Sequence, residues 1–128
     1  MLGGYAGKFL WVNLSDGTME EEIPSDDLLR DFVGGYGVGA KILFDRQKPK
    51  VDPLGPENTL GFTTGPLTAS AAPTGTRWCV VCKSPLTGGW GDANGSGFFG
   101  PVMKAAGYDA IFFTGQSNTP VYLFVDDG

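Results

Sequence analysis

The chain has 128 residues and a net charge of −5, with 21 glycines, 9 prolines and no histidine. The lack of histidine excludes Ser-His-Asp triads and histidine metal sites, and the acidic balance disfavours nucleic acid as a partner. Nine Phe, four Tyr and three Trp can form a core, so we expect a folded, turn-rich domain. The sequence has no apolar run of membrane-spanning length and no visible signal peptide, and its two cysteines fit a reducing compartment, so we expect a cytoplasmic protein without a membrane partner.

The N-terminal segment predicts a β-hairpin. Residues 7–14 have the alternation of a strand, Ser15-Asp16-Gly17 is a turn signal, and residues 18–23 form the return strand. Seven of the fourteen acidic residues fall within residues 16–31. We interpret this local excess of negative charge as a solvated face.

Two helices are predicted next. Ser25 can cap the first helix, and the acidic residues that follow it suit the helix dipole. The apolar face of this helix comprises Leu28, Leu29, Phe32 and Val33. Gly34-Gly35 ends it. The second helix is predicted over residues 38–46, with Ile42, Leu43 and Phe44 pointing inward.

The rest of the chain predicts more strands and one more helix. The strands are expected at residues 60–64, 76–83, 109–114 and 120–125. A glycine-rich loop at 84–97 precedes a short helix at 98–106. The ending Asp126-Asp127-Gly128 is a hairpin signal, so we expect a further strand beyond it and a longer parent protein. Together these elements predict an α+β fold with mixed or antiparallel sheets and about three short helices.

Two glycine-containing patterns are candidates for anion binding. Residues 34–39 (GGYGVG) precede a helix and could cradle a phosphate, or they could form a tight corner between helices. Residues 75–100 place Arg77 at the start of a strand and a glycine-rich loop after its end. Arg77 is suited to bind phosphate as a fork, and the loop offers amides and carbonyls to a large anionic ligand. A purely structural loop remains the alternative.

The cysteine pattern argues against a metal site. Cys79 and Cys82 form a C-x-x-C, but on a strand they would face opposite sides of the sheet. A second cysteine pair is absent from the sequence, so a tetrathiolate zinc or iron–sulfur site is excluded within this chain.

Several uncommon motifs occur together in one order along the chain. They are VDPLGPEN, FTTGPLT, KSPLTGG, GDANGSGFFG and AAGYDAIFFTG, with GGYAGKFLWVNLSDG and FVGGYGVGAKIL before them. In this order and spacing they resemble the N-terminal domain of the aldehyde ferredoxin oxidoreductase family, over about residues 3–128. The resemblance implies that residues 1–128 are the first part of a longer domain that binds a pterin cofactor.

The resemblance also implies the activity of the parent protein. Members of the family are tungsten, sometimes molybdenum, enzymes with a bis-pterin cofactor, Mg²⁺ and a [4Fe–4S] cluster, whose cysteines would lie downstream of residue 128. They oxidise aldehydes to carboxylates and pass electrons to ferredoxin, and relatives act on other acids or on aromatic thioesters. The implied partners are the rest of the enzyme chain, ferredoxin or another electron carrier, and a second copy of the enzyme.

The resemblance assigns four cofactor-binding residues and no catalytic residue. Arg77 would contact the cofactor, as would Asn94, Gly95 and Ser96, and the Asn94 carbonyl would ligate Mg²⁺ that bridges the pterin phosphates. This chain departs from the family pattern at two points. It has Asn94-Gly95-Ser96-Gly97 where the family often has Asn-Ser-Gly-Gly, and Tyr36 where the family often has Arg.

Two rival functions follow from the residues alone. One is a nucleotide-binding protein that uses the glycines of residues 34–39. The other is a non-catalytic module whose apolar surface docks a partner. As a fragment of the oxidoreductase, the isolated 128 residues are expected to be catalytically inert.

Overall fold

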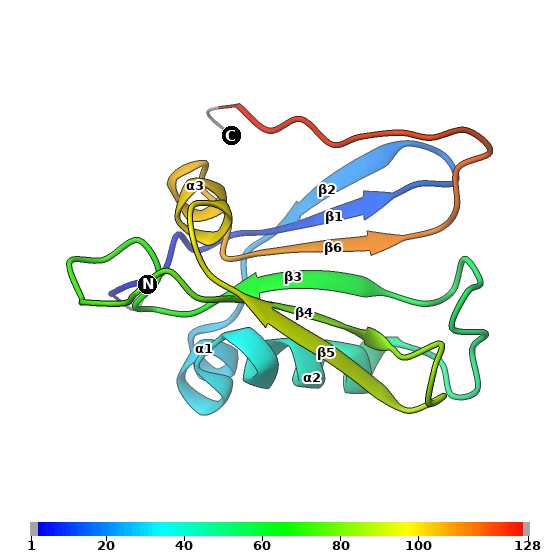
Figure 1. Cartoon of the computed structure of the whole chain (residues 1–128), viewed down its shortest axis with the longest axis horizontal. Coiled ribbons are helices and arrows are strands. Elements are labelled where there is room, and N and C mark those ends of the chain that lie inside the picture. Colours follow the sequence, from blue (N-terminus) through cyan, green and yellow to red (C-terminus); the bar gives the residue numbers. More distant parts are fainter. Residues whose placement is uncertain (1–2, 127–128) are drawn as a thin grey trace.

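The computed structural model describes residues 3–126, which form one six-stranded sheet with helices on both faces (Figure 1). The strand order is β2-β1-β6-β3-β4-β5. The strands are β1 (Phe9–Asn13), β2 (Thr18–Glu22), β3 (Leu60–Thr64), β4 (Trp78–Lys83), β5 (Trp90–Gly95) and β6 (Ala110–Thr114). The helices are α1 (Asp26–Phe32), α2 (Gly35–Arg46) and α3 (Phe99–Ala105). None of the helices in this part of the chain is long and apolar enough to cross a membrane.

The sheet is mixed, as predicted. β1 and β2 form the expected antiparallel hairpin, in which Trp11 is paired with Glu20. β6 pairs in parallel with β1 and antiparallel with β3, and β4 and β5 extend the sheet in antiparallel fashion. The predicted α+β class with three short helices is therefore confirmed.

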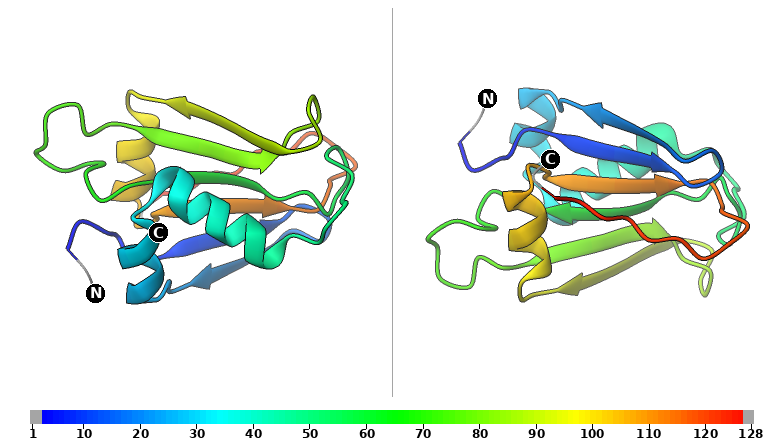
Figure 2. Two further views of the ribbon diagram at one scale, coloured as in Figure 1. Left: turned by 90° about the horizontal axis from the view of Figure 1, so that it is seen from below. Right: turned by 90° about the horizontal axis from the view of Figure 1, so that it is seen from above.

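Apolar side chains on both faces of the sheet form two cores. α1 and α2 cover one face, whereas α3 and the C-terminal segment lie over the other (Figures 1 and 2). The core under α1 and α2 consists of Phe9, Leu29, Val38, Ile42, Ala110 and Phe112. The core under α3 consists of Leu10, Val12, Met103, Tyr108 and Ile111. β1 and β6 each contribute to both cores because successive side chains of a strand alternate between the faces.

Helix α1 has the predicted start but a different end. The Ser25 hydroxyl accepts a hydrogen bond from the Leu28 backbone N–H at 3.1 Å, and Leu29 is buried. The prediction that Val33 joins the apolar face is wrong, because its side chain is 54% exposed. Val33 lies after the last helical turn with φ of 63°, and this left-handed conformation directs the chain away from the helix.

Helix α2 begins three residues earlier than predicted. Gly34 is its N-cap and Gly35 its first residue, so most of the 34–39 glycine run is helical. Ile42 and Leu43 are buried as expected. Phe44 is 86% exposed, so its predicted inward orientation is wrong. Ile42 and Leu43 already occupy the side of α2 that packs on the sheet, and Phe44 follows on the outer side.

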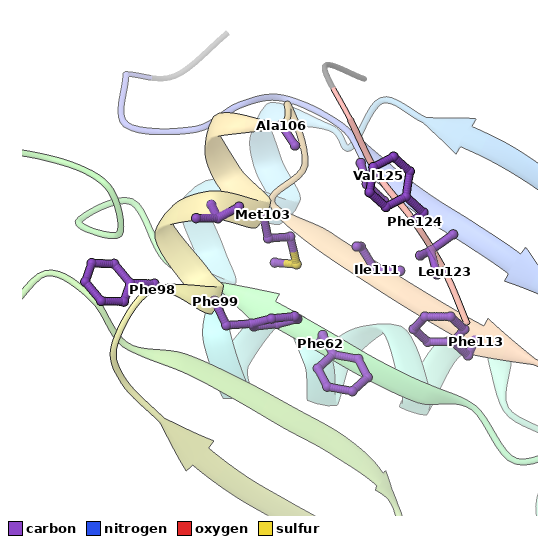
Figure 3. Close-up of a pocket in the computed structure, with 11 residues that line it drawn as sticks. Phe62, Phe98, Phe99, Met103, Ala106, Ile111, Phe113, Leu123, Phe124 and Val125 are labelled. Carbon is purple, nitrogen blue, oxygen red and sulfur yellow. The ribbon is translucent and has the colours of Figure 1, made fainter. Parts of the chain in front are cut away.

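Two predictions in the C-terminal half are also corrected. The predicted loop at 84–97 contains a strand, β5, which pairs with β4 over its whole length. The predicted strand at 120–125 is instead a segment outside the sheet. It crosses above the sheet, and Leu123 and Val125 pack against the core under α3 (Figure 3). A largely apolar cavity of about 560 Å³ lies between this segment, α3 and the sheet. Of the hairpin signal at the end of the chain, residues 127–128 lie outside the described residues.

A polar contact connects β2 to the residues just before β6. The Tyr108 hydroxyl donates to the Glu21 carboxylate at 2.7 Å, and Lys8 pairs with the same oxygen at 2.9 Å. The Tyr108 hydrogen bond is the larger cause that lowers the pKa of Glu21, and the Lys8 contact adds to it. Since the folded pKa lies below the unfolded one, Glu21 contributes stability at neutral pH that is lost as the pH falls through its folded pKa.

We expect Tyr108→Phe to raise the pKa of Glu21 toward the ordinary glutamate value, because the hydroxyl donor is lost. The measurement is an NMR titration of the Glu21 side-chain carboxyl carbon in both proteins. Glu57 of the variant serves as an internal control, since its partner Lys48 is unaffected. An unchanged Glu21 titration would contradict the hydrogen bond as the main cause.

Candidate functional site

A pocket opens where α2 begins, next to the start of β4. It has a volume of about 340 Å³ and is lined by the α2 N-cap region, the end of β3, the β3–β4 loop, Arg77 and Cys79. The first turn of α2 contains no acidic residue, so the positive end of the helix dipole is not neutralised there. Arg77, just before β4, and the glycines at the start of α2 thus line one pocket, although the sequence placed them in two separate candidate sites.

Glycine permits the close approach that forms this pocket. Gly34 has φ of 152°, and a Cβ atom there would lie 2.6 Å from the Thr64 carbonyl oxygen and 2.7 Å from the Gly65 Cα. The Thr63 hydroxyl donates to the Gly35 carbonyl at 3.0 Å. The start of α2 is therefore held against the end of β3 by backbone contacts that a side chain would prevent.

Arg77 is the cation of the pocket. Of the nine Lys and Arg residues, six form ion pairs: Lys8, Arg30, Lys41, Arg46, Lys48 and Lys104. Within residues 3–126 Arg77 has no carboxylate within ion-pair distance, and its Nη1 donates to the Asn94 Oδ1 at 2.6 Å. One amide thus holds an exposed guanidinium whose charge remains available to an anion.

Asn94 connects Arg77 to helix α2. Its Nδ2 donates to the Tyr36 hydroxyl oxygen at 3.0 Å, and it lies opposite Cys79 in the β4–β5 register. Burial raises the pKa of the Cys79 thiol, and hydrogen bonds from the Tyr36 backbone N–H and hydroxyl partly oppose this rise. Cys79 is therefore a protonated thiol at neutral pH and not an activated nucleophile.

Gly95 and Ser96 lie against Trp78 in the folded chain. A Cβ atom at Gly95 would come within 2.6 Å of the indole ring, so this position requires glycine for packing. The Trp78 Nε1 donates to the Ser96 carbonyl at 3.4 Å. The structure thus brings Arg77 and Asn94 into direct contact and places Gly95 and Ser96 beside them, around the indole of Trp78.

A buried ion pair supports the loop on the far side of the pocket. Lys104 and Asp109 are 3.5 Å apart, and their side chains are only 8% and 4% exposed. The Lys104 Nζ also donates to the Gly65 carbonyl at 2.5 Å. Burial lowers the pKa of Lys104, and the Asp109 carboxylate opposes this. This network connects α3 to the first residue of the β3–β4 loop.

Sequence reasoning did not assign Tyr36 or Gly34 to the site around Arg77. Both belong to a segment that was considered only as a separate phosphate loop. Because its glycines form the first turns of α2, they do not form such a loop. Cys79 and Cys82 both lie on β4, three residues apart, so they face opposite sides of the sheet as predicted. The described residues contain no cluster of three or more Cys, Asp or Glu residues able to hold a metal.

Comparison with known proteins identifies the family. The model of the aldehyde ferredoxin oxidoreductase N-terminal domain matches residues 9–128. The chain belongs to this family. A tungsten-containing aldehyde ferredoxin oxidoreductase from Pyrococcus horikoshii is 48% identical to it over 97% of the chain, and one from Thermococcus kodakarensis is equally similar. The WOR-like subunit of an aliphatic sulfonate oxidoreductase from Pyrococcus furiosus is 42% identical over 94% of the chain.

A solved structure shows that the fold is also shared. The active-site complex BamBC of benzoyl coenzyme A reductase, solved with 1,5-dienoyl-CoA, matches 99% of the chain with a TM-score of 0.96 and 37% identity. The chain spans about a fifth of the length of these relatives. It is thus an N-terminal domain from an oxidoreductase family, and relatives that are 48% and 49% identical to it are named as tungsten enzymes.

The residues of this family domain fit an anionic cofactor. The donor set consists of one guanidinium without a carboxylate partner and the positive end of a helix, and both face the same 340 Å³ pocket. Donors of this kind suit phosphate groups and not a bare metal cation. A metal at this place would therefore need oxygen ligands from the cofactor itself, together with backbone carbonyls.

Proposed function

We propose that residues 1–128 are the first part of a cofactor-binding domain, and that Arg77 binds an anionic group of a tungsten or molybdenum bis-pterin. The observation that carries this proposal is the guanidinium of Arg77, which has no ion-pair partner among the described residues and is held beside the pocket by Asn94. Tungsten in the names of relatives that are 48% and 49% identical supports the choice of metal.

We extend this proposal to backbone groups of the edge strand β5 and of Ser96, which follows it. β5 is the last strand of the sheet, and every second carbonyl of an edge strand lacks a partner strand. We assign the Asn94 carbonyl as a ligand of Mg²⁺ that bridges the pterin phosphates. Gly95 and Ser96 would contribute backbone groups, and since the Ser96 carbonyl accepts from Trp78, its N–H is the group left to contribute.

The parent enzyme would oxidise an aldehyde to a carboxylate and pass the electrons to ferredoxin, with a [4Fe–4S] cluster held by residues downstream. The bound cofactor supplies the redox chemistry, whereas Arg77 supplies charge and orientation. The sulfonate and benzoyl coenzyme A relatives support a second candidate substrate class, another acid or an aromatic thioester. The higher identity to the aldehyde enzymes favours the first.

We expect Arg77→Ala in the full-length enzyme to weaken cofactor retention about tenfold or more, because a charge-assisted hydrogen bond is lost. The measurement is tungsten and molybdenum per chain after anaerobic purification. Lys50→Ala is the matched control, since it also removes one positive charge without an ion-pair partner among residues 3–126, but lies at the other end of α2. Wild-type metal content in Arg77→Ala would refute the assignment.

A further inference from the structure

Three side chains form a continuous hydrogen-bonded chain across the site. They come from the second residue of α2, the edge strand β5 and the residue before β4, which lie together at one end of the sheet (Figure 1). Arg77 Nη1 is 2.6 Å from Asn94 Oδ1, and Asn94 Nδ2 is 3.0 Å from the Tyr36 hydroxyl. Both ends of the amide are therefore used within the protein.

The chemistry of the three groups fixes the direction of these bonds. A guanidinium only donates, so Asn94 must present its carbonyl oxygen to Arg77. The amide nitrogen then faces Tyr36, whose hydroxyl must accept. The Tyr36 proton is left free to donate. These two bonds fix the orientation of the amide plane, with the carbonyl oxygen toward Arg77 and the nitrogen toward Tyr36.

Tyr36 is the rigid end of this chain. Its backbone belongs to α2, whose first turn is held by the Gly37 N–H to the Gly34 carbonyl at 3.0 Å and by the Thr63 hydroxyl. Asn94 and Arg77, in contrast, are exposed. An exposed arginine samples many rotamers, and each one that is excluded before binding lowers the entropic cost of binding.

We infer that Tyr36 is a positioning residue, which holds Asn94 in the rotamer that aims the Arg77 guanidinium at the anionic groups of the cofactor. This inference rests on the proposed binding role of Arg77. It assigns to the Tyr36 hydroxyl an effect on cofactor affinity that is transmitted only through Asn94. Removal of either member of the chain must then have the same consequence, and removal of both must add nothing.

The test is a double-mutant cycle in the full-length enzyme with Tyr36→Phe, Asn94→Ala and the double variant. Asn94→Ala retains the backbone carbonyl and removes only the side-chain bonds. We expect each single variant to lose tungsten about 2- to 10-fold faster than wild type during anaerobic dialysis, and the double variant to lose it no faster than the single variants. Tyr122→Phe, on an 89% exposed tyrosine over the opposite face, is the matched control.

A second readout does not depend on the loaded enzyme. In the 128-residue chain, the two side-chain amide protons of Asn94 give separate NMR signals whose shifts report both hydrogen bonds. We expect Tyr36→Phe to shift them and Arg77→Ala to shift them as well. If Tyr36→Phe retains tungsten and leaves these signals unchanged while Arg77→Ala loses tungsten, the positioning role is overturned and the proposed function stands. If Arg77→Ala also retains tungsten, both are overturned.

Discussion

Replacement of Asp109 by alanine is expected to lower the free energy of unfolding by about 3–5 kcal/mol. Its carboxylate accepts hydrogen bonds from the backbone N–H groups of Ala6 and Gly7 at 3.0 and 2.6 Å and pairs with Lys104. Without it, the ammonium of Lys104 is left buried without its counter-ion, and two backbone donors lose their acceptor. Urea unfolding of the 128-residue chain measures the loss.

Asp45→Ala provides the comparison for this substitution. Asp45 forms an exposed ion pair with Lys41 at 2.8 Å within α2, and such pairs contribute about 0.3–0.5 kcal/mol. We therefore expect its removal to change stability by about 0.5 kcal/mol or less. Similar losses in the two variants would show that the buried network does not stabilise the fold. Asp109→Asn, which retains one acceptor oxygen, should fall between them.

The second large effect is expected at Gly34. Gly34→Ala should cost about 2–4 kcal/mol, because alanine would have to adopt a φ of 152° and its Cβ would collide with the backbone of Thr64 and Gly65. The start of α2 would have to move away from β3, which would also open the pocket beside Arg77. Urea unfolding measures the loss in the free energy of unfolding.

Substitutions at two other glycines separate the cost of the positive φ from the cost of the Cβ collision. Gly17 has φ of 73° but open space around its Cβ position, so Gly17→Ala measures the conformational cost alone, about 1–2 kcal/mol. Gly65 begins the β3–β4 loop that Gly34 approaches, but its own Cβ position is open and its φ is not positive. Gly65→Ala should therefore leave the free energy of unfolding nearly unchanged. If Gly34→Ala costs no more than Gly17→Ala, the close approach between α2 and β3 is not stabilising.

Local sequence signals predicted the elements that local interactions form. The hairpin of β1 and β2 turns at Asp16, whose carboxylate accepts from the Thr18 backbone N–H at 3.0 Å. α1 begins at a serine cap. Both features depend on residues close together in the sequence, so a short window contains the information.

Elements that depend on distant partners were not predicted. The segment Trp90–Gly95 contains two glycines and has low strand propensity, yet it forms β5 because β4 lies beside it. Residues 120–125 show the opposite case. Their apolar pattern is typical of a strand, but they run above the sheet and not along its edge. At both places, whether the segment forms a strand depends on whether another strand lies beside it to pair with.

The candidate site shows the same division. Arg77 and Asn94 could be selected from the sequence because their motifs are specific. Their contact with Tyr36 could not, because Tyr36 and Asn94 are 58 residues apart and meet only through the packing of α2 on the sheet. The prediction placed these residues in different candidate sites, and the sheet register unites them.

The position of β6 has a consequence for how this chain reaches its native state. Among residues 3–126, β6 comes after the other five strands in the chain, but it lies in the middle of the sheet, between β1 and β3. During synthesis, the β1–β2 hairpin and the β3–β4–β5 meander therefore cannot join until β6 has been made. Until then, the edges of β1 and β3 that pair with β6 stay unpaired. Such long-range pairing is slow, and the sheet closes only after residue 114 has been made. Until β6 is in place, the edges of β1 and β3 stay open to pairing with other chains, so we expect its insertion to be a slow step of folding.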